Sequence, residues 1–271
     1  MSNEMGTEAS TEETGAVGAG PRADVGVFGG SGLYQLLDDA HEHRITTPYG
    51  DPSGPVTIGQ MGERTVAFLP RHGLGHEYPP HRINYRANAW AMHSLGVRAI
   101  FAPCASGSLQ ADIAPGDVVV CDQIVDRTWG RSDTFFDGPE IGHLSFADPY
   151  DEMLRSVAIE ACRAEGVRVH ERGTVVVVQG PRFSTRAESR WYRDAGWQVI
   201  NMTQYPEAAL AAELAVPYVA LALITDYDCG LADDPDIAPV TQEEVFAVMA
   251  ANVAMIRSVL ARAVALLPRT G

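Results

Sequence analysis

The stretch Leu221-Ala-Leu-Ile-Thr-Asp-Tyr-Asp228 decides the fold and the site that this sequence predicts. Its apolar run is typical of a buried strand, and two carboxylates, Asp226 and Asp228, follow at the carboxyl end. Ligands of open parallel α/β sheets bind at that edge, so two acids there indicate a ligand site. If the backbone stays extended through Tyr227, both acids face the same side and can address N7 and the exocyclic amine of an adenine ring. The alternative is that Asp-Tyr-Asp only starts a turn, since Asp favours turns.

The composition favours a single α/β domain that binds a small molecule. The chain has 271 residues, of which 46% are hydrophobic, and this is enough for one sizeable core. Its formal net charge of −15 argues against nucleic acid or an anionic membrane as a partner, because a phosphate backbone is bound by surfaces rich in Lys and Arg. Any anion that the protein binds must therefore be bound locally.

The cysteines and the start of the chain favour a cytoplasmic protein. The four cysteines, at positions 104, 121, 162 and 229, show no C-x-x-C spacing, so we expect free thiols of a reducing cytosol and neither a zinc site nor a redox dithiol. No apolar run approaches a membrane span, and the start of the chain lacks the basic and apolar segments of a signal peptide. We therefore expect no membrane partner.

Two regions differ in composition. Residues 1–22 hold several glutamates among Gly, Ala, Ser and Thr, with almost no large apolar side chain, so they cannot bury enough surface to fold. We expect a disordered acidic N-terminal tail there and one domain over residues 23–271.

Within the domain, apolar runs alternate with segments of helical period, which predicts an α/β fold. Strands are expected at 24–28, 56–59, 64–69, 98–104, 117–122 and 174–179 and from 221, and helices at 84–95, 148–165, 206–215 and 241–267 and from 185. Asp148 is the expected N-cap of the helix that follows it. Thr185 with Glu188, and Thr241 with Glu244, form expected capping boxes.

Three loops at strand ends have the residues of an anion or purine site. The first strand runs into Gly29-Gly-Ser-Gly-Leu33, where glycine lets backbone N–H groups approach an oxyanion and Ser31 offers the one hydroxyl. Arg71 and His72 follow the strand 64–69, and Arg suits bidentate contact with phosphate. Each feature alone is equally compatible with a plain turn or a solvated loop, and together they predict an anion cradle. Phe183 can stack on a purine, although isolated aromatics usually belong to the core.

The segment from Arg127 to Leu144 has neither helical nor strand period. Its length suggests a function or a subunit contact, because loops without secondary structure are rarely this long in compact domains.

Taken together, these motifs resemble the methylthioadenosine phosphorylase branch of the trimeric purine nucleoside phosphorylase family. The motifs occur in family order between about residue 24 and residue 267. Six motifs in this order make a chance match unlikely, whereas each motif alone is a weak signal. They are Gly29-Gly-Ser-Gly-Leu33, Arg71-His-Gly73, Asn84-Tyr-Arg-Ala-Asn88, Gly180-Pro-Arg-Phe-Ser184, Asn201-Met-Thr203 with Pro206-Glu207, and Thr225-Asp-Tyr-Asp-Cys229.

The resemblance implies which residues bind phosphate and nucleoside. For phosphate it implies Ser31, Arg71, His72, Cys104, Ala105 and Thr203. Cys104 stands where family members often have Thr, so its side chain is a weaker donor and contact there falls to backbone N–H groups. For the nucleoside it implies Asn201, Met202 against the ribose, Phe183 against the base, Asp226 at N7, Asp228 at the exocyclic amine, Ser184 and Gln242 near the purine and 5′ pockets, and His143 from a neighbouring subunit.

The resemblance also implies a homotrimer of α/β subunits around a twisted mixed sheet, with inorganic phosphate as co-substrate and neither metal nor organic cofactor. Cleavage of the N-glycosidic bond builds negative charge on the purine, so a protonated Asp226 would act as general acid at N7. Phosphate would then capture the oxocarbenium-like C1′. The expected reaction is phosphorolysis of methylthioadenosine to adenine and a sugar 1-phosphate.

Three alternatives stay open. An Asp228 carboxylate accepts from a 6-amino group and faces a 6-oxo group acceptor to acceptor, so a 6-oxopurine nucleoside phosphorylase is less favoured. A hydrolase needs no anion cradle, so the Arg71-His72 pair argues against it. A nucleoside-binding protein without turnover is the third alternative.

Overall fold

The computed structural model describes residues 20–29, 37–139, 141–230 and 237–268. The acidic tail up to residue 19 and Ser31 of the glycine loop lie outside these ranges, so the expectations for them are not addressed by the fold.

The described residues form one mixed sheet of eleven strands. The strands are β1 (Val25–Gly29), β2 (Asp38–His43), β3 (Val56–Met61), β4 (Arg64–Pro70), β5 (Ile100–Ser108), β6 (Val118–Val120), β7 (Gln123–Arg127), β8 (Val169–His170), β9 (Thr174–Val178), β10 (Val199–Asn201) and β11 (Tyr218–Asp226). The helices are the 3-10 turn η2 (Pro80–Arg82), α1 (Tyr85–Ser94), α2 (Glu152–Ala164), α3 (Arg186–Asp194), α4 (Gln204–Glu213) and α5 (Gln242–Leu266). This alternation confirms the expected α/β class with a mixed sheet.

The sheet branches at β5. Its first residues pair in parallel with β1, and most of its length pairs in parallel with β11. Its last two residues pair antiparallel with β10, from which the order continues through β9 to β7. On the other side, β1 pairs in parallel with β4. The carboxyl ends of β1, β4, β5 and β11 therefore meet at one edge, the edge at which ligands of such sheets bind.

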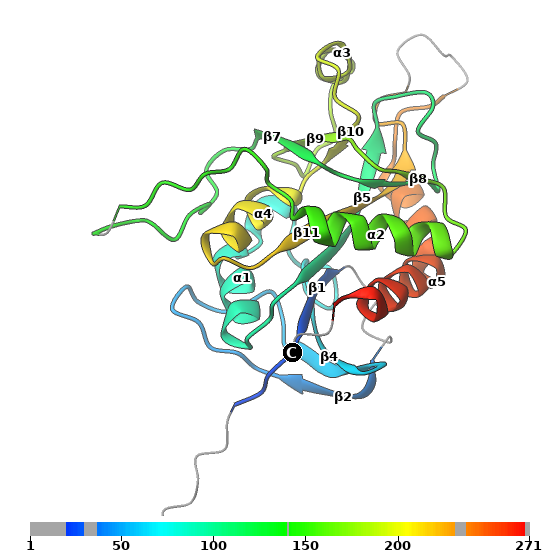
Figure 1. The fold of residues 1–271 in the computed structure, drawn as a ribbon. Helices are drawn as coiled ribbons and strands as arrows, with labels where there is room; N and C mark the ends of the chain where they lie inside the picture. The colour runs from blue at the N-terminus through cyan, green and yellow to red at the C-terminus, as the bar shows by residue number, and fades with distance from the viewer. Residues whose placement is uncertain (1–19, 30–36, 140, 231–236, 269–271) are drawn as a thin grey trace, which may run out of the picture.

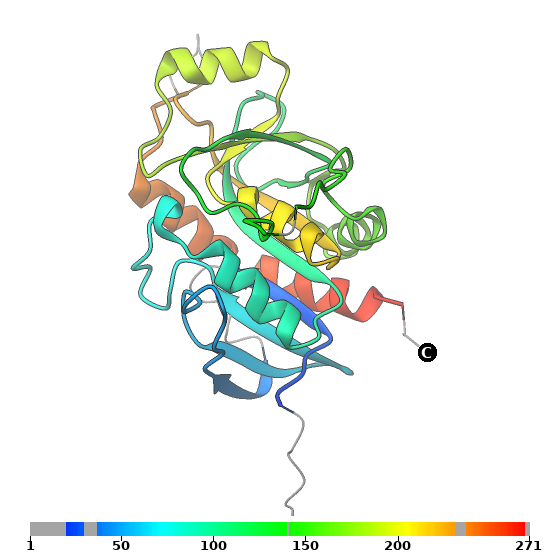
Figure 2. The ribbon, with the colours of Figure 1, turned by 90° about the vertical axis from the view of Figure 1, so that its left-hand side faces the viewer.

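Helices cover both faces of the sheet. α2 and α5 pack against each other over one face, and α1 and α4 pack against each other over the opposite face (Figures 1 and 2). β11 contributes to both cores, since its side chains alternate between the faces. Ala220, Ala222 and Ile224 belong to the core on the α1 and α4 side, and Val219, Leu221 and Leu223 to the core on the α2 and α5 side. A strand buried on both faces explains the continuous apolar run in its sequence.

The expected helix caps are confirmed in two cases and wrong in one. Thr185 with Glu188, and Thr241 with Glu244, form complete capping boxes. α2, however, has Asp151 as its N-cap, not Asp148. The N–H of Asp151 donates to the carbonyl of Tyr218 in β11, and this tertiary bond of 3.0 Å delays the start of the helix by three residues relative to its pattern.

α5 is more apolar than the sequence analysis allowed. Among the described residues it is the helix that is long and apolar enough to span a membrane by length and composition, with a mean hydropathy of 1.6 over its best window. Its second half instead packs into the core through Ile256, Val259 and Leu260, each at most 1% exposed. Such packing is typical of a helix that covers a sheet in a globular domain.

Candidate functional site

β11 ends in a bulge that aims Asp226 at its neighbour strand. Ile224 lies opposite Ser106 and Asp226 opposite Gly107, so Thr225 is an extra residue in β11. Bulges often redirect side chains beside active sites. The Asp226 carboxylate lies so close to Gly107 that a Cβ built on this glycine would be 2.8 Å from Oδ1. Glycine at position 107 thus leaves the room that the carboxylate needs.

The chain turns directly after Asp226, and the N–H of Gly230 donates to the carbonyl of Tyr227 at 2.9 Å. Asp228 has a φ of +54°, and its N–H donates to Oδ1 of Asp226 at 2.7 Å. A short Asp side chain readily accepts from the N–H two residues further on, and this favours the turn. The turn alternative is therefore correct for the backbone, and the turn still brings the two acids together.

Burial shifts the protonation of both acids. Burial raises the pKa of Asp226 above its ordinary value, the charge of Asp228 adds to the rise, and hydrogen bonds from the Thr225 hydroxyl (2.6 Å) and the Asp228 N–H oppose it. Burial also raises the pKa of Asp228, and the nearby hydroxyls of Ser189 and Ser184 partly offset this rise. A carboxyl with a raised pKa is suited to give a proton near neutral pH.

One carboxylate oxygen of Asp228 accepts no hydrogen bond from the described residues. Its side chain is only 3% exposed, and Oδ2 has no partner at hydrogen-bond geometry among the described residues. The same is true of Oγ of Ser184, although this hydroxyl is close enough to influence the charge of Asp228. Buried polar atoms usually have partners, so an orphaned acceptor beside an orphaned hydroxyl points to a ligand.

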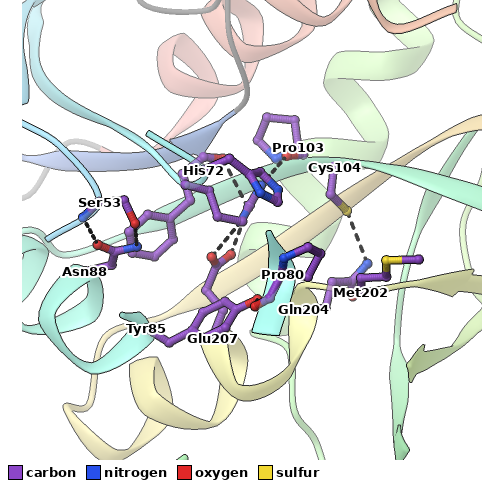
Figure 3. A network of polar contacts seen from close by, with 12 residues as sticks. Ser53, His72, Pro80, Tyr85, Asn88, Pro103, Cys104, Met202, Gln204 and Glu207 are labelled. Atoms are coloured by element: carbon purple, nitrogen blue, oxygen red, sulfur yellow. Dashed lines mark hydrogen bonds and ion pairs between the residues drawn. The ribbon is translucent and has the colours of Figure 1, made fainter. Parts of the chain in front are cut away.

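Arg71 is buried and pairs with a carboxylate to which the sequence analysis gave no role. Its Nε and Nη2 donate to Glu207 at 2.7 and 2.9 Å (Figure 3). Tyr218 donates to the same carboxylate at 2.8 Å. Nη1 and Nη2 make longer contacts with the carbonyls of Pro103 (3.3 Å) and Phe28 (3.4 Å). Burial alone disfavours the charged guanidinium, but Glu207 outweighs it and raises the pKa of Arg71. Arg71 is therefore already paired with Glu207, and Nη1 is the guanidinium nitrogen with the weakest hydrogen bonding.

His72 is neutral at neutral pH. Burial, followed by the charges of Arg71 and His76, lowers the pKa of His72 to about 4, against the opposing effect of its bond to Tyr78. Nδ1 lies 2.8 Å from the carbonyl oxygen of Tyr78, which can only accept, so Nδ1 carries the proton. Nε2 is then left as an acceptor.

Cys104 lies in a buried network of amides and thiols. Its Sγ accepts from Asn201 and from Gln204, both at 3.4 Å, and donates to the Leu221 carbonyl at 3.8 Å. Figure 3 shows the contact with Gln204. Gln204 also donates to Cys121 at 3.7 Å. The thiol of Cys104 is thus mainly an acceptor here, which agrees with the doubt about its side chain as a phosphate donor.

Some of the predicted site residues are buried and take part in the contacts above, and the others are half-buried or exposed. Arg71, Cys104 and Asn201 are linked by the contacts above, and the Arg71 N–H donates to the carbonyl of Gly29, where the glycine loop starts. Thr203 is buried just before α4 and makes no capping bond with its side chain. The remaining predicted residues are Ala105 in β5 and Met202 after β10, both half-buried, Phe183 at 36% exposure, and Gln242 and His143, which are exposed.

His143 belongs to the segment 128–147, which we call the arm. Figure 1 shows the arm extending well away from the sheet on the side of α1 and α4. Its described residues, 128–139 and 141–147, lie in neither a helix nor a strand. Within the described residues, no three His, Cys, Asp or Glu side chains gather in a way that would hold a metal ion.

Residues 24–265 match the model of a family described as the phosphorylase superfamily. This chain belongs to the phosphorylase superfamily. A purine nucleoside phosphorylase of Streptomyces coelicolor is 50% identical over 258 residues, which cover 92% of this chain and 91% of the relative. An S-methyl-5′-thioadenosine phosphorylase of Mycolicibacterium smegmatis is 55% identical over 208 residues, covering 76% of this chain and 78% of the relative.

Solved structures of the superfamily agree with the fold. A methylthioadenosine phosphorylase from Schistosoma mansoni in complex with adenine superposes with a TM-score of 0.85 at 37% identity, covering 90% of this chain and 92% of that chain. A variant of the Schistosoma mansoni enzyme in complex with methylthioadenosine gives a TM-score of 0.84 at 37% identity, covering 90% and 91%. The resemblance stated from the sequence motifs is confirmed.

Sequence reasoning missed three residues that shape this superfamily site. Glu207 and Gln204 sit on α4, and only their contacts with Arg71 and Cys104 reveal what they do. The closeness of Gly107 to Asp226 arises from the pairing of β5 with β11, which no local pattern indicates. The sequence signal for Glu207 is the Pro206-Glu207 motif, which does not indicate that Glu207 pairs with Arg71.

Proposed function

We propose that this protein catalyses the phosphorolysis of S-methyl-5′-thioadenosine to adenine and 5-methylthioribose 1-phosphate. The observation that carries this is the pair of buried acids at the end of β11, where burial raises the pKa of Asp226 and Oδ2 of Asp228 has no partner among the described residues. The relatives and the Schistosoma mansoni enzyme that carry methylthioadenosine in their names support this substrate.

Asp226 is the general acid in this proposal. The departing purine takes on negative charge at N7, and a carboxyl that is held protonated by burial can hydrogen-bond to N7 and then donate its proton there. The Asp228 N–H and the Thr225 hydroxyl fix both oxygens of the Asp226 carboxyl, so its orientation is set before the substrate arrives.

Asp228 supplies the choice of base. Its unpartnered Oδ2 suits the donor of a 6-amino group, whereas a 6-oxo group would leave two acceptors facing each other in a buried place. The second candidate is a purine nucleoside phosphorylase of broader or 6-oxopurine specificity, which the name of the Streptomyces coelicolor relative favours.

Phosphate is held, in this proposal, between the carboxyl end of β4, the middle of β5 and the start of α4, by Arg71, Ala105, Thr203 and, through their main chains, His72 and Cys104. Ser31 of the glycine loop joins them. The Arg71–Glu207 pair makes this corner nearly neutral, so the anion is held by directed N–H and O–H donors rather than by excess charge. Holding phosphate next to C1′ contributes most of its effect through proximity.

The remaining nucleoside contacts come from Asn201, Met202, Phe183, Ser184 and Gln242 of one subunit and from His143 of a second. The protein therefore acts as a homotrimer in the cytoplasm, uses inorganic phosphate as co-substrate and needs neither metal nor organic cofactor. The catalytic domain of this proposal spans residues 23–271.

The test is release of free base from methylthioadenosine, adenosine and inosine, each with and without phosphate. The proposal expects methylthioadenosine to give adenine only when phosphate is present. Faster turnover of inosine would favour the second candidate. Equal release without phosphate would identify a hydrolase, and binding without any release would leave a nucleoside-binding protein.

A further inference from the structure

Arg131, at the start of the arm, makes more hydrogen bonds to main-chain carbonyls than its place in an irregular segment would suggest. Nη1 donates to the carbonyls of Met202 (3.0 Å) and Tyr205 (2.6 Å), and Nη2 donates to that of Gln179 (2.9 Å), with a longer contact to Val178 (3.4 Å). Nε donates to the side chain of Gln179 at 3.2 Å. One guanidinium thus joins three segments that are distant in sequence, namely the arm, residues 178–179 and residues 202–205.

These three segments carry the nucleoside residues of the proposed site. Gln179 directly follows β9 and leads into Gly180-Pro-Arg-Phe-Ser184, which bears Phe183 and Ser184. Met202 is the ribose candidate, and its sulfur packs so closely on Gly180 that a Cβ there would lie 2.6 Å from Sδ. Arg131 holds the main chain on both sides of this contact.

The charge of Arg131 is not used in an ion pair within the described residues. Burial lowers the pKa of Arg131, and the guanidinium lies 5.4 Å above the ring of Tyr85, whose hydroxyl also accepts from Nη1 at 3.3 Å. Removing a cation from water without a carboxylate costs free energy. In exchange, the position gains a planar fork of five N–H donors on three nitrogens, which can reach carbonyls on separate segments, whereas an ammonium has three donors on one nitrogen.

We propose that Arg131 is a positioning residue for the nucleoside: it fixes Met202 and the Gly180–Ser184 loop relative to each other and ties both to the arm. This inference rests on the proposed phosphorolysis. Arg131 does not belong to the phosphate corner, whose contacts run through Arg71, Glu207 and Cys104. Of the phosphate residues, Thr203 lies between two of the carbonyls that Arg131 binds, and the others do not, so the loss of Arg131 should act on the nucleoside more than on phosphate.

The experiment compares steady-state kinetics of wild type, Arg131→Lys, Arg131→Ala and Arg86→Ala, with circular dichroism to confirm folding. Arg86 is the matched control, since it also holds the arm, through the Thr134 carbonyl (3.4 Å) and Asp137, without touching the nucleoside segments. We expect both Arg131 variants to raise KM for methylthioadenosine by about tenfold or more, with KM for phosphate within about twofold of wild type. Arg86→Ala should leave the ratio of the two KM values unchanged.

Added guanidinium chloride at millimolar concentration should restore part of the lost activity of Arg131→Ala, and sodium chloride at the same concentration should not. Equal changes in both KM values, an equal effect of Arg86→Ala, or loss of folded protein in both Arg131 variants would overturn the proposal and leave Arg131 with a purely structural role. If the wild type shows phosphate-dependent turnover and any of these results is obtained, the role of Arg131 is refuted while the proposed function stands. A wild type without phosphate-dependent turnover overturns both.

Discussion

Asp226 is the residue on whose protonation the proposed reaction depends. Because burial raises its folded-state pKa above the unfolded value, the protonated form stabilises the folded protein at low pH, and this contribution is lost as pH rises through the folded pKa. The same titration removes the proton that N7 needs. The turnover number should therefore fall as pH rises through the raised pKa of Asp226, which a pH profile at saturating methylthioadenosine and phosphate measures.

Asp226→Asn should remove most of this turnover, by roughly 100-fold or more, without loss of stability. The amide does not titrate, and Thr225 can donate to the Ser106 carbonyl, now 3.3 Å away, in place of the lost carboxylate. Thermal unfolding at several pH values should show the variant gaining on the wild type as pH rises. Near-normal activity in Asp226→Asn would refute the role of this residue as acid.

Gly107 tests the geometry of Asp226 without changing its chemistry. A Cβ at position 107 would lie 2.8 Å from Oδ1 of Asp226, 3.0 Å from Ile200 and 3.3 Å from the main-chain nitrogen of Asp228. The carboxylate must move away, so Gly107→Ala should lower kcat by roughly 100-fold, the loss expected for a displacement of about 1 Å. Gly116→Ala would be a poor control because its φ is +95°, whereas Gly20→Ala meets no atom within 4 Å and should keep full activity. Full activity in Gly107→Ala would mean that Asp226 is placed differently during catalysis.

At the scale of elements, the sequence predicted those features that local chemistry decides. The apolar run of β11 and the capping boxes at Thr185 and Thr241 have local causes and are confirmed. β2 was not predicted, because its sequence, from Asp38 to His43, is polar and almost wholly exposed, and its pairing with β3 makes it a strand. The start of α2 was misplaced because a bond to Tyr218, far along the chain, holds Asp151.

The same distinction between local patterns and long-range contacts applies to the candidate site. Loops at the ends of strands indicated Arg71 and Asp226, since topology brings such ends to one edge. The partners of these residues could not be predicted from the sequence. Glu207 meets Arg71 across 136 residues, and Gln204 meets Cys104 across 100, so only the packing of α4 against the sheet creates these contacts.

The link between β4 and α4 gives a prediction at this scale. Glu207→Gln leaves the buried charge of Arg71 uncompensated, which should lower the free energy of unfolding by about 3–5 kcal/mol and raise KM for phosphate. The double variant Arg71→Met with Glu207→Gln removes the lone charge and should recover much of that stability while remaining inactive. Urea unfolding of the three proteins measures this. A double variant that is less stable than Glu207→Gln alone would contradict the account of a neutral, paired corner.

At the scale of the whole molecule, the arm is the feature that a single subunit leaves unexplained. Trp129 and Ile141 are 73% and 84% exposed, and Phe136 and Leu144 are also exposed on the same segment. Soluble proteins rarely leave so many large apolar side chains together in water unless another surface covers them. The proposed trimer supplies that surface, since each arm would reach a neighbouring subunit and bring His143 to its 5′ pocket.

Light scattering should therefore give the wild type a mass three times the 29.2 kDa of the chain. Ile141→Glu places a charge on the apolar arm and should shift the protein toward monomer, with loss of activity, because a charge buried at an interface is strongly penalised. His143→Ala should leave the trimer intact and raise KM for methylthioadenosine more than KM for adenosine, since it acts on the 5′ substituent. A fully active monomer would show instead that one subunit holds the complete site, and that the exposed apolar arm has another partner.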